Sequence, residues 1–240
     1  MPTWLCLAIA LVGCGRHNFD ELSDAEPGGD SPDGASACST TFCDDFDRPP
    51  PATDGWDGMR SGTNGTVTVT PTGTLLITLP ATGDSAFLIK HLPAPTSKMT
   101  IAFRIKYTSA APGIAEVDLV QLHWDMPTAG CASEGFYLVR NSTGPFDLQE
   151  TYTGGCGTNV NTELVDLANS GFHDVKMTLS LGVQSVAHIQ VLIDALPPYE
   201  VTAAHPIPSS TVRLEIGGGA VRDVTTTFTV EYDDLVIEVQ

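Results

Sequence analysis

Hydrophobic and polar residues alternate along short segments through most of the chain. In "KMTIAFRIKY" (98–107) and "FTVEYDDLVIEV" (228–239), β-branched and aromatic residues recur at about every second position. That is the period of a strand with one buried face. Gly, Pro, Asn and Asp lie between such segments and favour turns. We therefore predict strands at 65–71, 73–79, 86–92, 98–107, 116–124, 135–140, 146–152, 174–181, 187–195, 199–204, 211–217 and 228–239.

The spacing of these strands predicts the fold class. They follow one another at intervals of about ten residues without alternating helices, which is typical of an antiparallel β-sandwich. The best helical pattern is "NTELVDLANSG" (161–171), which predicts one short helix at most. No linker-like composition interrupts residues 38–240, so we predict one all-β domain there. Two smaller β domains are the alternative.

The N-terminal segment has the pattern of an export leader. Residues 1–13 carry no charge, and "WLCLAIALVG" is far shorter than the ~20 apolar residues that span a bilayer. "LVGC" (11–14) resembles the lipobox of bacterial lipoproteins, although no Lys or Arg precedes the apolar run. The resemblance implies removal of residues 1–13, lipidation of Cys14 and an exported, outer-membrane lipoprotein that faces the periplasm or the cell surface. The polar, acidic residues after Cys14, up to residue 37, predict a flexible linker.

The remaining cysteines fit an exported protein. Cys6 lies in the leader, which leaves Cys38, Cys43, Cys131 and Cys156. An even number in an oxidising compartment predicts disulfides, and three pairings are open. We favour Cys38–Cys43 and Cys131–Cys156, because each pair brackets a compact segment. Zinc is the rival interpretation, but the short spacing of a zinc knuckle is missing.

The charge of the chain restricts its partners. The formal net charge is −18, which disfavours nucleic acid and anionic lipid head groups. Divalent cations and neutral ligands such as sugars are compatible with it. The simpler interpretation is that acidity keeps an exported protein soluble.

Three segments together resemble the concanavalin A-like lectin/glucanase jelly roll, the superfamily that includes laminin G-like domains. They are "FCDDFDR" with "GWD" at 55–57, then "FHDVKMTLSL…HIQVLIDA" (172–195), and the closing "YDDLVIEV" (232–239). The resemblance implies that the first and last strands are neighbours, which seals a sheet edge. It also implies a structural Ca²⁺ near the termini, for which carboxylate oxygens are suitable ligands. The candidate ligands are Asp44, Asp45, Asp47, Asp233 and Asp234, and a solvated acidic edge is the alternative.

One strand resembles a glycosidase active site. "EVDLVQ" (116–121) is similar to the E-x-D-x-x-E strand of laminarinases and lichenases, which makes Glu116 and Asp118 weak catalytic candidates. Gln121 stands where the resemblance requires the acid/base carboxylate, and an amide cannot serve as one. Regular alternation also places Gln121 on the opposite face from Asp118 unless the strand bulges.

Aromatic residues in the middle third suggest ligand binding instead. Sugar sites use exposed aromatic rings beside a few polar groups, and the candidates are His123, Trp124, Tyr137 and Tyr152. We therefore expect an envelope lipoprotein with a non-catalytic, lectin-like sandwich that binds carbohydrate or another extracellular ligand. A glucanase-like hydrolase and a structural or adhesive envelope protein without a small ligand are the alternatives.

Overall fold

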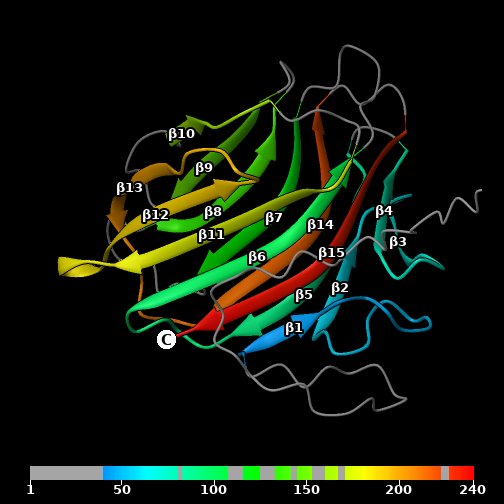
Figure 1. Ribbon diagram of the computed structural model, residues 1–240, viewed down its shortest axis with the longest axis horizontal. Helices are drawn as coiled ribbons and strands as arrows, with labels where there is room; N and C mark the ends of the chain where they lie inside the picture. Colours follow the sequence, from blue (N-terminus) through cyan, green and yellow to red (C-terminus); the bar gives the residue numbers. More distant parts are fainter. Residues whose placement is uncertain are drawn as a thin grey trace, which may run out of the picture. The chain divides into compact units, whose positions relative to one another are not determined.

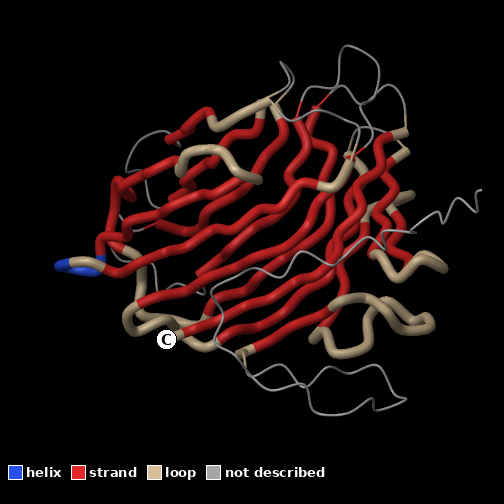
Figure 2. The backbone as a smooth tube through the Cα atoms, in the orientation of Figure 1, coloured by secondary structure: helices blue, strands red, loops and turns tan. Residues whose placement is uncertain are grey.

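Strands account for nearly all regular structure in the described part of the chain (Figure 2). The computed structural model describes residues 40–80, 83–107, 116–124, 133–141, 145–152, 160–166, 171–222 and 227–240. Within these residues the single helical element is a 3₁₀ turn at Val183–Ser185. The first residues of the segment predicted as a possible helix belong instead to a strand, Val160–Glu163, where a neighbouring strand supplies their backbone hydrogen bonds; residues 167–170 of that segment lie outside the described residues.

The first sheet has eight antiparallel strands (Figure 1). β6 (Lys98–Tyr107) and β15 (Phe228–Val239) lie at its centre. The order of the strands across the first sheet is β13 (Tyr199–Pro206), β12 (Val186–Ile193), β11 (His173–Leu181), β6, β15, β4 (Leu75–Leu79) and β3 (Thr66–Val69). β1 (Phe42–Asp44) also pairs with β15.

The second sheet has seven strands, and they are also antiparallel. Its centre is formed by β7 (Glu116–Trp124) and β14 (Val212–Arg222). The order is β10 (Val160–Glu163), β9 (Phe146–Tyr152), β8 (Ser133–Arg140), β7, β14, β5 (Ser85–Leu92) and β2 (Gly58–Ser61). The predicted all-β antiparallel sandwich is confirmed.

The first and last strands are neighbours, as predicted. Phe42 pairs with Ile237 and Asp44 with Leu235. The indole nitrogen of Trp56 donates to Asp44 Oδ2 at 2.7 Å, and the Trp56 ring packs edge-on against Phe42. The "FCDDFD" and "GWD" segments therefore anchor the start of the described chain to β15.

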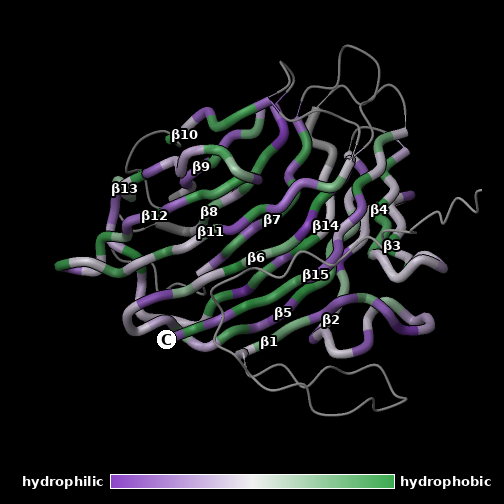
Figure 3. Tube along the Cα trace, viewed as in Figure 1, coloured by the Kyte–Doolittle hydropathy of each residue, from purple (hydrophilic) through white to green (hydrophobic). Residues whose placement is uncertain are grey.

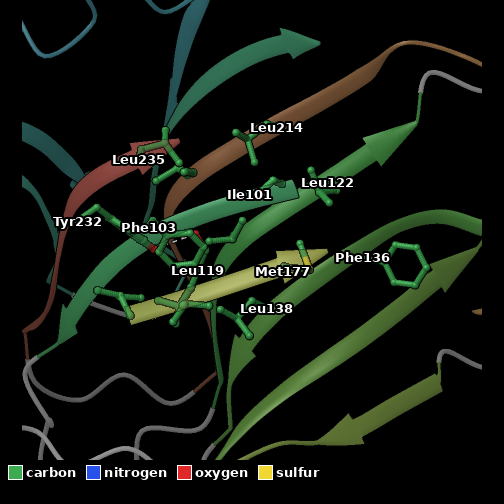
Figure 4. Close-up of a cluster of buried hydrophobic side chains, with 14 of the residues drawn as sticks. Ile101, Phe103, Leu119, Leu122, Phe136, Leu138, Met177, Leu214, Tyr232 and Leu235 are labelled. Carbon is green, nitrogen blue, oxygen red and sulfur yellow. Dashed lines mark hydrogen bonds between the residues drawn. The ribbon is translucent and has the colours of Figure 1, made fainter. Parts of the chain in front are cut away.

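The hydrophobic core lies between the two sheets. Green and purple alternate along the strands in Figure 3, which is the pattern that sends every second side chain inward. Figure 4 shows Leu119, Leu122, Phe136 and Leu138 of the second sheet together with Ile101, Phe103, Met177 and Tyr232 of the first. Every residue that alternates with the core residues of β7, β8, β9 and β14 consequently points to the outer side of the second sheet.

Candidate functional site

A set of polar side chains occupies the outer side of the second sheet. One row follows the strand register: Glu215 of β14 pairs with Gln121 of β7, Gln121 with Tyr137 of β8, and Tyr137 with Gln149 of β9. Directly paired residues lie on the same side of a sheet. We call this surface the polar face, which comprises Arg60, Glu116, Asp118, Gln121, His123, Tyr137, Asp147, Gln149, Glu163, Arg213 and Glu215.

A bulge in β7 assembles the centre of the polar face. The pairing of β7 with β8 shifts register between Asp118 and Val120. As a result, Gln121 lies on the same face as Asp118, and its amide nitrogen donates to Asp118 Oδ2 at 2.8 Å. Regular alternation would have placed Gln121 on the opposite face unless the strand bulged, and the bulge is present: one extra residue reverses the facing of the residues beyond it.

Gln121 contacts a guanidinium group and an imidazole, and the imidazole in turn contacts a phenol. Its Oε1 accepts from Arg60 Nη2 at 3.3 Å and lies 3.1 Å from His123 Nε2. Because Oε1 can only accept, Nε2 carries the proton, and His123 Nδ1 accepts from the Tyr137 hydroxyl at 3.2 Å. The His123 and Tyr137 rings are in contact, with centroids 5.0 Å apart. Gln121 is only 5% exposed, so it forms the floor of the site.

Arg60 covers a buried carboxylate. Glu215 is 2% exposed and forms ion pairs with the guanidinium groups of Arg60 and Arg213, the latter at 3.0 Å. The Arg60 guanidinium also lies over the Phe87 ring, 4.6 Å from its centroid. With 47% of its side chain exposed, Arg60 remains available to a ligand.

Three further carboxylates, Glu116, Asp118 and Asp147, belong to β7 and β9 of the polar face. Glu116 Oε1 accepts from Gln149 at 3.3 Å. Burial, and next the charge of Glu116, raise the pKa of Asp118 to about 6, while the hydrogen bond from Gln121 opposes that rise. Burial also raises the pKa of Asp147; the hydrogen bond from Asn141 opposes this effect.

The structure places two of the four predicted aromatic residues at this site. His123 and Tyr137 are half-buried on the polar face. Trp124 differs from the prediction: it is 3% exposed and packs edge-on against Phe136 in the core. It follows His123 in the strand and therefore points inward, so it offers no stacking surface. Tyr152 ends β9, and its side chain lies outside the described residues.

Asp44, one of the predicted calcium ligands, has its contacts within the protein. Asp44 accepts from Phe46 N, Trp56 Nε1 and Arg48. Among the residues with described positions, no group of three or more His, Cys, Asp or Glu could hold a metal ion. Calcium stays a prediction from the sequence.

A second acidic group lies at a bulge in β15. The pairing of β15 with β6 is shifted between Asp233 and Val236, and Asp234 has a positive φ. Arg104 Nη1 lies 3.1 Å from Asp233 and 3.4 Å from Asp234. Burial and the neighbouring Asp234 raise the pKa of Asp233 to about 6. The charge of Asp47 also raises the pKa of Asp233. Asp47 lines a surface hollow of about 540 Å³ with Arg48 and residues 69–73, and Asp45 Oδ1 accepts from the Asp47 amide.

Most of the predicted export and disulfide features lie outside the described residues. They include Cys14, the leader, the linker, Cys38, Cys131 and Cys156. Cys43 is disulfide-bonded, and its partner is not among the described residues, so both predicted pairings stay predictions. Within the part of the chain that is described, no helix has the length and apolar character to cross a membrane.

Known structures share this fold, although no protein-family model and no curated protein sequence matches the chain. An endo-β-1,4-glucuronan lyase from the fungus Trichoderma reesei superposes with a TM-score of 0.64 at 14% identity, over 84% of this chain and 96% of that one. Alginate lyase A1-II', of polysaccharide lyase family 7, gives 0.54 at 12% identity, over 75% and 85%. Alginate lyase Aly36B gives 0.52 at 9% identity, over 83% and 97%. At such identities the similarity establishes the β-sandwich jelly-roll fold.

Proposed function

We propose that this chain binds a polysaccharide along the polar face. The observation that carries this proposal is the hydrogen-bonded row from Arg60 through Gln121 and His123 to Tyr137. Sugars offer hydroxyl groups that donate and accept hydrogen bonds, together with apolar ring faces. Carboxylates, amides, a guanidinium group and aromatic rings on one surface complement both features.

The extent of the polar face suits a chain of sugars. Its central row crosses β14, β7, β8 and β9, which at ~4.8 Å between strands is about 14 Å. The chain shares its fold with polysaccharide lyases, and this similarity supports a carbohydrate-related role.

Affinity electrophoresis against a panel of soluble polysaccharides tests this proposal. Tyr137→Ala and His123→Ala should abolish retardation by a polysaccharide that retards the natural chain. His188→Ala is the matched control, because His188 is an exposed histidine on β12 of the other sheet. If none of the panel retards the natural protein, or if the His188 variant loses binding equally, the proposal is wrong.

Cleavage is a second candidate function, favoured by the contact between Tyr137 and His123. In an elimination, a base takes the proton beside a uronate carboxyl group, a C=C bond forms, and the glycosidic C–O bond breaks. The leaving oxygen then receives a proton. A tyrosine hydroxyl that can exchange its proton with His123 Nδ1 could take part in such transfers, while Gln121 and Arg60 would bind the carboxyl group. Ultraviolet absorbance of the unsaturated product, measured with glucuronan and alginate, tests this candidate; a natural chain that binds either polymer without forming product excludes it.

The hydrolase alternative has weaker support. Gln121 donates to Asp118 as an amide, and it has no carboxyl proton to give to a leaving sugar. The glycosidase-like strand thus contributes binding groups rather than an acid/base pair.

The cellular location remains part of the proposal. Lipidation at Cys14 would display the sandwich at the envelope, where polysaccharides are accessible. Metabolic labelling with a fatty-acid analogue should label the natural chain, whereas Cys14→Ala should carry no label. Label that persists in the variant would exclude this anchor.

A further inference from the structure

The polar face carries an excess of negative charge. Among its described residues, five carboxylates (Glu116, Asp118, Asp147, Glu163 and Glu215) share the surface with two guanidinium groups. Both of those groups form ion pairs with Glu215. The remaining four carboxylates lie on β7, β9 and β10. Arg60 also acts on Asp118, because its charge lowers the pKa of that carboxyl group, whereas Asp147 and Glu163 lie farther along the sheet on β9 and β10. A ligand that spans the face therefore meets a negative region there.

Asp147 is the buried member of this region. It is 5% exposed, its Oδ2 accepts from Asn141 at 2.9 Å, and its Oδ1 is buried without a hydrogen-bond partner. Glu163 is its direct cross-strand partner. An ionised carboxylate that is buried with an unsatisfied oxygen is costly unless positive charge lies near. Since Oδ1 is covered, Asp147 acts on a ligand through its charge, while Glu116 and Asp118 provide the more accessible oxygens.

We infer that the polar face prefers a glycan that carries protonated amino groups, such as a polymer of β-1,4-linked glucosamine. This inference rests on the proposed polysaccharide binding and adds the substrate class. An ammonium group can donate charge-assisted hydrogen bonds to Glu116 and Asp118, and these are stronger than bonds between neutral groups. A uronate in the same place would meet like charge. The proposed ligand is thus opposite in charge to the glucuronan named for the Trichoderma reesei lyase.

Three oligosaccharides of equal length separate the possibilities. They are a β-1,4-linked glucosamine oligomer, its fully N-acetylated form and a β-1,4-linked glucuronate oligomer, compared by isothermal titration calorimetry at one pH at which the glucosamine amines are protonated. We expect the glucosamine oligomer to bind about tenfold more tightly than the acetylated one, a difference of about 1.4 kcal/mol. Added salt should reduce that ratio.

Variants assign the preference to the carboxylates. Glu116→Gln, Asp118→Asn and Asp147→Asn should each lower the ratio of the affinities for the amine and the acetylated oligomer, and circular dichroism shows whether each variant is folded. Glu200→Gln is the control, because Glu200 is an exposed carboxylate on β13 of the first sheet.

Each result has one meaning. Equal affinity for the amine and the acetylated oligomer overturns this inference but leaves polysaccharide binding intact. Tighter binding of the glucuronate oligomer also overturns it and supports the cleavage candidate. Failure of all three oligomers to bind, together with no retardation by the polysaccharide panel, removes the proposed function and this inference with it.

Discussion

The hydroxyl of Tyr232, on the first sheet, reaches across the core to the backbone of Leu119 in the second sheet (Figure 4). The distance to the Leu119 carbonyl oxygen is 2.9 Å, and the Gly217 carbonyl oxygen lies 2.6 Å from the same hydroxyl. Leu119 is the residue at the β7 bulge, and the pairing of β14 with β7 is also shifted just after Ile216. The single hydroxyl hydrogen of Tyr232 is thus shared between two carbonyls where both ladders are irregular, directly beneath the bulge that turns Gln121 toward Asp118.

Tyr232→Phe should lower the free energy of unfolding by about 1–3 kcal/mol, because it leaves two buried carbonyl oxygens without their donor. Urea denaturation monitored by circular dichroism measures this change. Tyr199→Phe, at a half-buried tyrosine of β13, should change stability by less than about 0.5 kcal/mol. Equal effects of the two substitutions would show that the Tyr232 hydroxyl does not stabilise the fold.

Gly135→Ala should destabilise the protein and weaken glycan binding together. A Cβ atom at Gly135 would lie 2.1 Å from the Leu122 carbonyl oxygen, which belongs to the backbone of β7 and cannot move aside. Relief requires β8 to shift away from β7, which separates Tyr137 from His123. We expect a loss of about 1–3 kcal/mol.

Gly58→Ala is the matched control for that change, because a Cβ atom at Gly58 meets nothing within 4 Å. Thermal melts and calorimetric titrations of both variants test the prediction. A Gly135 variant that melts like the Gly58 variant would contradict the close approach of the two strands.

The raised pKa of Asp118 predicts that the free energy of unfolding depends on pH. The pKa of Asp118 is about 6 in the folded protein, against an ordinary value of 3.8 that applies to the unfolded chain. Between these two pH values the native state therefore binds more protons than the unfolded state. The contribution of Asp118 to stability therefore falls as pH rises from about 4 to about 7. Relative to Asp118→Asn, the natural chain should lose stability over that range and then level off.

Asp57 provides a control of opposite sign. The backbone hydrogen bond from His91, supported by Lys90, lowers the pKa of Asp57. Its contribution is present above about pH 4 and is lost as the solution becomes more acidic. Unfolding free energies of both Asn variants at a series of pH values check the two slopes, and parallel slopes would refute the assignment.

Arg60→Met should cost about 1–3 kcal/mol of stability, because buried Glu215 then retains only Arg213 as a cation. Adding Glu215→Gln to that variant should recover part of the loss, since the unpaired charge is removed. Arg104→Met, which breaks ion pairs among half-exposed side chains of the first sheet, should cost less than about 1 kcal/mol. Denaturant unfolding of the four proteins measures these effects, and no recovery in the double variant would contradict the pairing.

The strands could be read from the sequence because periodicity reports burial. Lys98–Tyr107, Glu116–Trp124, Phe146–Tyr152 and Phe228–Val239 form with the predicted bounds. Gly58–Ser61 and Val160–Glu163 were not predicted as strands, because they are short edge strands with few apolar residues. Their pairing partners, rather than their own composition, hold them in the sheet.

The polar face was only partly predictable. Period-two alternation predicted that Glu116 and Asp118 share a face, and Tyr137, a predicted binding residue, lies half-buried on that face. Arg60 and Gln149 were missed, because each reaches the site from a strand distant in sequence. Arg213 and Glu215 alternate with buried Leu214 and Ile216, so their shared outward face was visible in the pattern, but not their neighbours.

By itself, the sequence determined the all-β class, most strand positions and the acidic character of the chain, because these depend on local alternation and composition. Tertiary structure alone decided which strands are neighbours, that Trp124 points inward, and that Gln121 joins Asp118 and His123 on one surface. A bulge is a single extra residue whose backbone groups are satisfied elsewhere, here by Tyr232 more than one hundred residues later in the chain. Local pattern cannot report such a contact, because its energy comes from the packing of two sheets.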